Sequence, residues 1–336
     1  MTLTKRVLGT TGLEITTVGF GAWAAGGGGW SFGWGPQDDA ESLAAMRRAI
    51  ELGVNWIDTA AVYGLGHSEE VVGRLLRDLP AANRPLVFTK CGLVWDEADR
   101  MAAPRRDLRP DSIRKECDAS LRRLGLERID LYQFHWPDQT GTAIEDSWTE
   151  MGRLIEAGKV RFGGVSNMGV DLLDRCEALR HVASVQPPFS GIQRTVADSV
   201  LPWCRRHSTG TIVYSPMQAG ILTDSFSRAR IDGMAADDWR RGGAEFQSPR
   251  LERNLALRDA LRSVASRHGS TVAAVAIAWV LAWPGITGAI VGARSAAQVD
   301  GWIGGASLTL SPAELDEIAA AITRTGAGKG PNRPGA

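Results

Sequence analysis

The sequence has no net charge to attract a polyanion. Its 336 residues hold 38 Lys and Arg against 38 Asp and Glu, and no block of five or more like charges occurs. Proteins that bind nucleic acid or anionic membrane surfaces carry a basic excess or a basic patch. Neither partner is therefore expected. With 44% hydrophobic and 23% charged residues, the composition is that of an ordinary globular protein.

Long apolar runs and clustered cysteines are also lacking. The longest apolar segment, from Val272 to Trp283, ends at Pro284 and is shorter than the roughly 20 residues of a membrane helix, so it predicts a buried core helix. The N-terminus has no apolar signal segment. Four dispersed cysteines without a CxxC pair favour a reducing cytoplasm. The histidines show no metal-ligand spacing, so no metal is predicted.

Eight short apolar runs alternate with amphipathic stretches. This pattern of repeated βα units predicts a (β/α)₈ barrel of the TIM type, in one domain over residues 1–324. Ahead of the first strand, residues 5–8 and 13–15 predict a hairpin that closes the bottom of the barrel. The expected strands are Thr17–Gly19, Val54–Ile57, Leu86–Thr89, Asp130–Phe134, Phe162–Val165, Ala183–Val185, Thr211–Tyr214 and Ala289–Val291.

Three long insertions interrupt the repeat, at 23–37, 92–108 and 217–249. Loops of this length are usually functional or disordered, and at a barrel mouth the functional interpretation gains weight. For the loop 217–249 two interpretations stay open, closure over a bound pyrophosphate or a solvated loop. The tail 325–336 is rich in Gly and Pro and is expected to be unstructured.

One dinucleotide-binding pattern is set aside. Residues Gly19 to Ala24 fit G-x-G-x-x-A after a strand, and Asp38 or Asp39 could serve as the ribose acid. A Rossmann unit needs a helix to open there. The following glycine run, from Gly26 to Gly29, cannot start a stable helix.

Four polar residues lie at or just past the ends of three predicted strands: Asp58, Tyr63, Lys90 and His135. In a barrel they converge on one mouth. An ammonium beside a phenol lowers the pKa of the phenol, so Tyr63 becomes a usable general acid, while a carboxylate keeps the lysine charged and oriented. A histidine donor would orient a carbonyl oxygen. These four side chains together could protonate an alkoxide as it forms, and the reaction would then require a hydride source.

The sequence resembles the aldo-keto reductase family from Arg6 to about Ile322, including its potassium-channel β-subunit branch. The matching segments are Gly53–Gly64 with Ser68–Glu69, Lys90, Leu121–Leu126 with Ile129–His135, Gly158–Arg161 with Gly164–Asn167, Gln186–Pro188, and Tyr214–Pro216. The resemblance implies that Asp58, Tyr63, Lys90 and His135 are a catalytic tetrad with Tyr63 as the acid. It also implies a nicotinamide cofactor bound without a Rossmann fold.

The resemblance further implies the cofactor contacts. Ser166, Asn167 and Gln186 would bind the carboxamide, and Tyr214 would stack on the nicotinamide ring. The remaining implied contacts are Ser215, Met217, Gly220 and Leu222 for the pyrophosphate, and Gly292, Arg294 and Gln298 for the adenosine end. A guanidinium suits a 2′-phosphate, so NADPH is expected over NADH. The chain departs from many relatives at Gly292, Gly301 and Trp302, which bear on cofactor discrimination.

Two other functions remain open. A nucleotide-binding, redox-sensing scaffold with little turnover would resemble the channel β subunits, although no additional docking segment is evident. A barrel enzyme that forms a Schiff base on Lys90 would leave Asp58 and Tyr63 without a role. The oligomeric state cannot be deduced from the sequence.

The tryptophans suggest the substrate. Trp23, Trp95 and Trp136 follow three expected strands, whereas Trp30 and Trp34 could equally cover the backbone of their own insertion. Indole walls favour apolar and aromatic ligands through buried area and ring stacking. Aromatic or medium-chain aldehydes are therefore expected over free sugars. Cys91, next to Lys90, is expected to point out of the barrel, because alternate strand residues face opposite sides.

Overall fold

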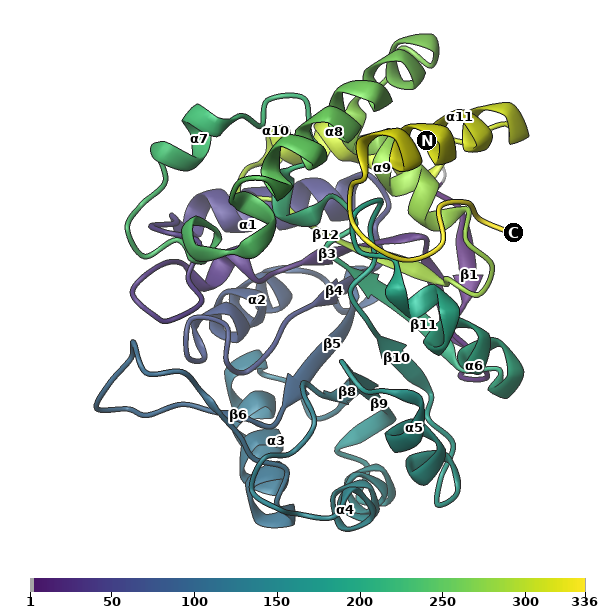
Figure 1. Ribbon diagram of the computed structural model, residues 1–336. Coiled ribbons are helices and arrows are strands. Elements are labelled where there is room, and N and C mark those ends of the chain that lie inside the picture. Colours follow the sequence, from purple (N-terminus) through teal and green to yellow (C-terminus); the bar gives the residue numbers. More distant parts are fainter. Residues whose placement is uncertain (1–2, 336) are drawn as a thin grey trace.

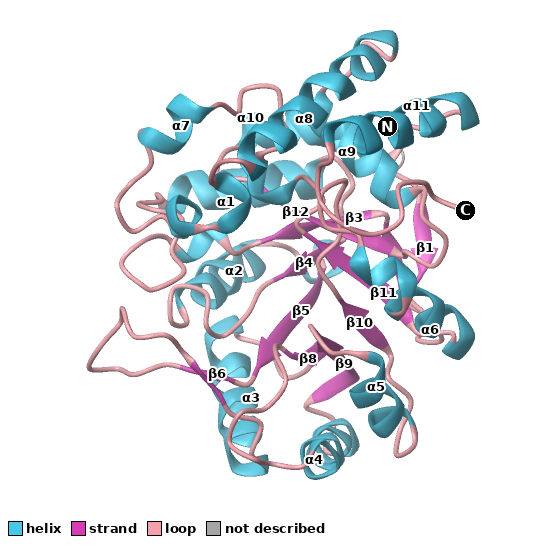
Figure 2. Cartoon of the chain, viewed as in Figure 1, coloured by secondary structure: helices cyan, strands magenta, loops and turns pink. Residues whose placement is uncertain are grey.

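The computed structural model describes residues 3–335 and is built around a closed barrel of eight parallel strands (Figures 1 and 2). Around the barrel the strand order is β10-β11-β12-β3-β4-β5-β8-β9, so each strand pairs with its neighbours in sequence. The (β/α)₈ prediction is confirmed. The barrel strands are β3 (Val18–Gly21), β4 (Trp56–Asp58), β5 (Leu86–Cys91), β8 (Ile129–Phe134), β9 (Val160–Ser166), β10 (Ser184–Gln186), β11 (Gly210–Tyr214) and β12 (Gly288–Gly292).

Helices cover the outside of the barrel and alternate with its strands. Local sequence fixes several of their ends. The Asp38 carboxylate accepts hydrogen bonds from the amides of Ala40 and Glu41 at the start of α1, and α3 begins with Pro110 in its first turn. The helices are α1 (Asp39–Glu51), α2 (His67–Asp78), α3 (Pro110–Leu124), α4 (Ile144–Glu156), α5 (Val170–Glu177), α6 (Val200–His207), α7 (Arg228–Asp232), α8 (Arg250–Arg267), α9 (Val272–Leu281), α10 (Ala296–Trp302) and α11 (Pro312–Thr325).

The predicted N-terminal hairpin is present. Strands β1 (Lys5–Val7) and β2 (Glu14–Thr16) pair antiparallel. Leu8, Leu13 and Ile15 are buried in one cluster with the barrel residues Trp56 and Phe88. Since those two side chains come from the beginning and middle of their strands, the hairpin closes the amino-terminal end of the barrel.

The apolar segment near residue 280 forms α9, in which every residue is buried. Among the described residues, no single helix has the length and composition to cross a bilayer; one pair, α8 with α9, would meet those criteria together but is bent by 93°. The four cysteines are free and buried. Cys91 packs outside the barrel with Ile113 and Cys117 of α3, as strand alternation predicts.

The three insertions lie on the same side of the barrel, at the left of Figure 1. They follow β3, β5 and β11, so they border the end where the strands finish, hereafter the barrel mouth. The insertion after β5 forms a small hairpin of β6 (Leu93–Val94) and β7 (Arg105–Arg106). Their common position makes this mouth the place for a functional site.

The C-terminal tail does not match its expected disorder. Residues 326–335 pack against the segment after β10, where the buried Arg194 guanidinium donates to the carbonyls of Ala327, Gly330 and Pro331. Gly328 has a φ of +64°, and a Cβ there would lie 1.6 Å from a backbone oxygen. The glycines therefore permit close backbone packing, which composition alone cannot distinguish from disorder.

Replacing Arg194 by Ala should release this tail. The variant loses several charge-assisted hydrogen bonds at a buried site, so the free energy of unfolding should fall by about 2 to 4 kcal/mol. Denaturant unfolding measures the loss, and hydrogen exchange of residues 327–335 locates it. Arg324→Ala, at an exposed arginine of α11, is the control. Unchanged exchange in the tail of Arg194→Ala would contradict this role.

Candidate active site

The four residues expected to form a tetrad meet at the barrel mouth. Asp58 ends β4, Lys90 lies in β5, Tyr63 lies in the turn after β4, and His135 follows β8. The Tyr63 and His135 rings are 5.6 Å apart and nearly perpendicular. Lys90 Nζ lies 5.2 Å from the centre of the Tyr63 ring. The barrel thus assembles side chains from three separate strands.

The Lys90 ammonium and the Asp58 carboxylate form a buried ion pair. Their Nζ and Oδ1 atoms are 2.5 Å apart, and the side chains are only 1% and 3% exposed. Lys90 also donates to the carbonyl of Thr59 at 2.8 Å, and Gln186 donates to the other Asp58 oxygen at 2.9 Å. Burial raises the pKa of Asp58 and lowers the pKa of Lys90, while their mutual attraction opposes both shifts.

The expected lowering of the Tyr63 pKa is not found. Burial raises the pKa of Tyr63 well above 10, and the Asp58 carboxylate adds to this effect. Lys90 does not reverse the shift, because its charge is compensated by Asp58 in direct contact. Burial, together with the Lys90 charge, holds the pKa of His135 well below 6.5. At neutral pH the site therefore offers a protonated phenol and a neutral imidazole.

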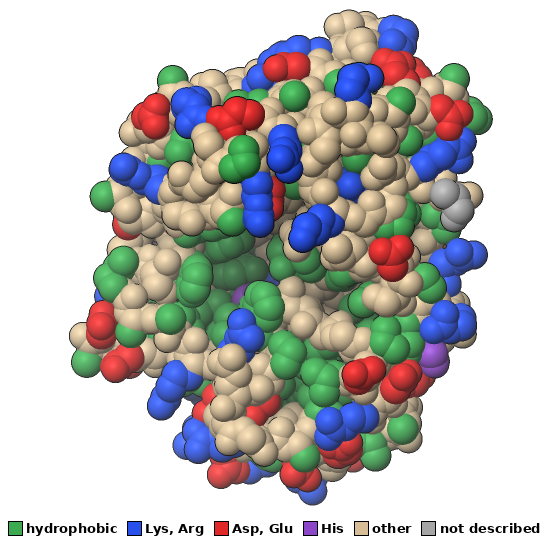
Figure 3. All heavy atoms as spheres, in the orientation of Figure 1, with side chains coloured by type: hydrophobic (Ala, Val, Ile, Leu, Met, Phe, Trp, Pro, Cys, Tyr) green, Lys and Arg blue, Asp and Glu red, His purple; other side chains and the backbone are tan. Residues whose placement is uncertain are grey.

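A cavity of about 810 Å³ opens at the mouth. Asp58, Tyr63 and His135 line it at one end, and Arg294 and Gln298 line it as well. Figure 3 shows this face hollowed, with hydrophobic side chains around the hollow. Most of the expected cofactor residues line the same space: Ser166, Asn167, Gln186, Tyr214, Ser215, Met217, Gly220, Gly292, Arg294 and Gln298.

A hydrogen-bonded row joins several of these residues. The Tyr214 hydroxyl donates to the Asn167 side chain at 2.8 Å, and Asn167 donates to the His135 carbonyl at 2.9 Å. The Ser166 hydroxyl donates to the backbone carbonyl of Gln186 at 2.8 Å. These contacts fix the polar wall that faces the tetrad. Leu222 is the exception among the expected cofactor residues, because its side chain is fully buried in the core cluster.

Of the three tryptophans expected at the substrate site, Trp23 and Trp136 line the cavity and Trp95 does not. The Trp95 indole donates to Glu97 at 2.9 Å, lies 6.0 Å from the Arg123 guanidinium and packs against the cluster of Trp30, Ala60 and Val62. Trp30 and Trp34 both line the cavity. Trp30 also donates to the Gly27 carbonyl of its own insertion. It therefore both lines the cavity and covers the backbone of its insertion, the two roles that the sequence left open.

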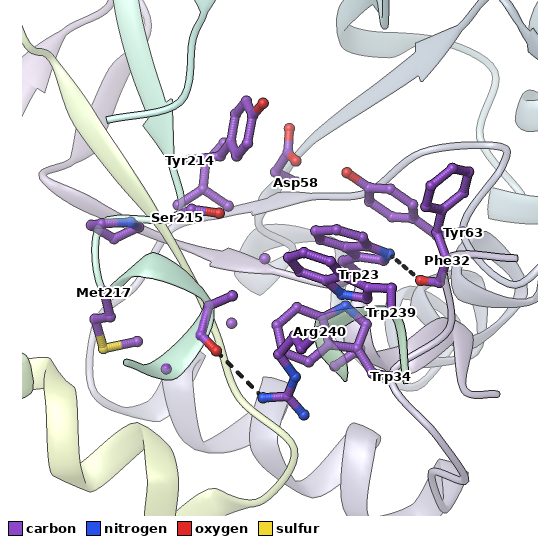
Figure 4. A pocket seen from close by; sticks show the side chains of 18 of the residues that line it. Trp23, Phe32, Trp34, Asp58, Tyr63, Tyr214, Ser215, Met217, Trp239 and Arg240 are labelled. Atoms are coloured by element: carbon purple, nitrogen blue, oxygen red, sulfur yellow. Dashed lines mark hydrogen bonds between the residues drawn. The ribbon is translucent and has the colours of Figure 1, made fainter. Parts of the chain in front are cut away.

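Sequence reasoning missed an aromatic stack at the mouth (Figure 4). Trp23 is stacked between Tyr63, at 5.8 Å, and Trp239 of the insertion after β11, at 5.3 Å. Trp34 meets both indoles edge-on, and Arg240 lies over it at 4.4 Å. No periodicity exists in long loops to place such residues. The abundance of tryptophan was the one available signal.

Comparison with known proteins agrees with this geometry. A profile described as the aldo/keto reductase family matches residues 17–323. "Aldo-keto reductase YhdN" of Bacillus subtilis is 34% identical over 291 residues, which cover 86% of this chain and 85% of that protein. The "NADH-specific methylglyoxal reductase" of Escherichia coli is 31% identical and covers 95% and 99%.

A solved structure is similar over almost its full length. The glycerol dehydrogenase AKR11B4 from Gluconobacter oxydans superimposes with a TM-score of 0.86 and 35% identity, covering 97% of each chain. Family profile, relatives and fold thus agree with one another. The chain belongs to the aldo/keto reductase family of oxidoreductases.

Proposed function

We propose that the protein reduces the carbonyl group of an aldehyde or ketone to an alcohol with a nicotinamide cofactor, with Tyr63 as general acid. The observation that carries this proposal is the position of Tyr63 beside His135, with ring centres 5.6 Å apart, in the wall of a cavity of about 810 Å³. When bound, the nicotinamide supplies a hydride to the carbonyl carbon. Tyr63 gives its proton to the oxygen, so one hydride and one proton complete the alcohol.

His135 and Lys90 assist this transfer. Because its imidazole is neutral, His135 can donate a hydrogen bond to the carbonyl oxygen and orient it toward Tyr63. The forming alkoxide is a stronger base than a phenolate, so proton transfer from Tyr63 is favourable even with a raised pKa. The Lys90 ammonium, 5.2 Å from the centre of the ring, then offsets part of the phenolate charge, although its ion pair with Asp58 weakens this effect.

Tyr63→Phe tests the proton donor. The variant keeps the ring and its stack with Trp23 but cannot donate, so turnover should fall by about 10² to 10⁴, the usual contribution of general acid catalysis. Cofactor affinity, measured by fluorescence titration, should stay unchanged. Tyr132→Phe, at a buried tyrosine packed outside the barrel, is the matched control.

Two results would contradict the assignment. Turnover of Tyr63→Phe within threefold of wild type would exclude Tyr63 as the acid. A wild-type protein that binds nucleotide but completes a single turnover in excess aldehyde would instead indicate the nucleotide-binding scaffold.

The protonation state of His135 is a separate prediction. Because burial lowers its pKa, the imidazole should stay neutral as the pH falls through 6.5 and gain its proton only at lower pH. Nitrogen-15 NMR of the labelled histidines measures this directly, with His135→Gln to assign the signal. A titration midpoint at or above 6.5 would contradict a neutral donor at this position.

We propose NADPH as the preferred cofactor. The guanidinium groups of Arg230 and Arg294 line the cavity, and neither has a carboxylate within salt-bridge distance among residues 3–335. Such groups suit the phosphates of a dinucleotide. The backbone of Gly220, with a φ of +102°, offers a close approach for the pyrophosphate. The E. coli relative is named NADH-specific, so the family itself does not decide the cofactor.

Arg294→Ala should therefore weaken NADPH far more than NADH. Loss of one charge-assisted contact with the 2′-phosphate corresponds to about 1.5 to 3 kcal/mol, or roughly 10- to 150-fold in dissociation constant. Binding titrations with both cofactors measure the difference. Arg228→Ala, at an exposed arginine paired with Glu252, serves as the control. Equal losses for the two cofactors would exclude a 2′-phosphate contact.

The aromatic cavity wall supports aromatic or medium-chain aldehydes as substrates, with Trp23 and Trp136 contributing indole surface.

A cytoplasmic location is supported by the four buried cysteines, all of which are free.

A further inference from the structure

Arg106 is a further charged residue of the cavity wall, which it lines together with His135. Arg106 is in β7 of the hairpin after β5 and pairs with Leu93 of β6. Both side chains line the cavity, as do His135 and Trp136. The Arg106 carbonyl accepts a hydrogen bond from the Gln139 amide at 3.1 Å, which ties the hairpin to the segment that follows β8. Arg106 is therefore positioned from two directions.

The Arg106 guanidinium is stacked but not neutralised. Its central carbon lies 4.3 Å from the centre of the Trp136 ring. Within the described part of the chain, no carboxylate approaches it within salt-bridge distance. Another cavity arginine, Arg240, shows the contrast, because both oxygens of Asp238 bind it. Trp136 thus holds the flat face of Arg106, while the N–H donors at its edge stay available.

Among the described residues, the side chains of Asp58, Tyr63, Lys90 and His135 do not balance this charge. Lys90 and Asp58 neutralise each other, and His135 and Tyr63 are uncharged at neutral pH. Arg106 therefore leaves a net positive charge beside the carbonyl-binding groups. The walls around it are apolar and aromatic, and in such surroundings a charge-assisted contact is stronger than in water.

We propose that Arg106 selects aldehydes that carry a carboxylate at the end remote from the carbonyl. The planar guanidinium fork matches a carboxylate, and the aromatic walls suit a flat apolar linker. This inference rests on the proposed function and leaves its chemistry unchanged: hydride still goes to the carbonyl carbon and the Tyr63 proton to its oxygen. The remote carboxylate only binds, so Arg106 determines specificity without touching the reacting atoms.

The experiment compares matched substrates that differ in charge and by one methyl group. Initial rates are measured for 3- and 4-carboxybenzaldehyde and for their neutral methyl esters, with wild type and Arg106→Gln. In wild type, the acids should have the higher kcat/KM. In Arg106→Gln, the KM for the better acid should rise about 10- to 100-fold, as expected for the loss of a charge-assisted contact, with kcat little changed. The esters should change less than twofold.

Two controls separate charge recognition from a structural role. Arg105→Gln removes the neighbouring arginine, which is exposed and absent from the cavity wall, and should leave both substrates unaffected. Arg106→Lys should recover part of the preference for the acid, since it keeps the charge but not the planar fork. Added salt should raise the wild-type KM for the acid and leave that for the ester unchanged.

The outcomes are distinguishable. Equal losses for acid and ester in Arg106→Gln would make Arg106 a structural residue of the hairpin and overturn the inference. If Arg106→Gln left kcat/KM unchanged for both the acids and the esters, the inference would be overturned as well. If wild type reduced neither the acids nor the esters with either nicotinamide, the proposed function itself would fail, and the inference with it.

Discussion

The buried ion pair between Lys90 and Asp58 is the constraint on which the site depends. Each charge is inaccessible to water, so each requires the other, and removing one partner of such a pair costs about 3 to 5 kcal/mol. The pair joins the adjacent strands β4 and β5, and Gln186 binds Asp58 from β10, elsewhere in the barrel wall. The polar groups of the mouth are thus held by a network that crosses the barrel interior. Tyr63 lies beside this network on the short turn after β4.

The same pair explains which electrostatic expectations fail. A lysine and a tyrosine at the ends of neighbouring predicted strands suggest a lowered phenol pKa. In the structure, however, the Lys90 charge is compensated by its direct contact with Asp58. Desolvation then dominates the pKa of Tyr63, whose proton is retained at neutral pH. Residue types and strand ends cannot reveal this balance, because it depends on burial and on distances of a few ångströms. The consequence for chemistry is that the proton is released only to a strong base, such as an alkoxide.

The periodicity of the sequence predicted the barrel because each strand and helix is recognisable from its own short segment. Each interior strand is a short apolar run, and the expected strands overlap all eight observed ones, although β9 begins at Val160, two residues earlier than expected. The proximity of Asp58, Tyr63, Lys90 and His135 could be predicted, since parallel strands bring their ends together. Loops obey no such rule. Trp95 was expected at the cavity from its position after Lys90, yet it is absent from the cavity wall and binds Glu97 instead. Trp239 could be placed only through its stack on Trp23. The prediction of an unstructured tail was wrong for the same reason, because no periodic pattern indicates that its glycines pack around Arg194.

The aromatic stack links the two ends of the cavity. Trp23 stacks on the ring of Tyr63 and on Trp239, so one indole connects the insertion after β11 with Tyr63. This insertion is also tied to the first one by the amide of Gly29, which donates to Asp237 at 2.9 Å. It carries Arg230 and Arg240 to the wall that Arg294 lines. The loop arginines of the cavity wall and the aromatic residues beside Tyr63 therefore belong to the same insertion and its packing partners. A change in this insertion that displaces Trp239 will therefore alter the packing around Tyr63 as well, because Trp23 stacks on both rings.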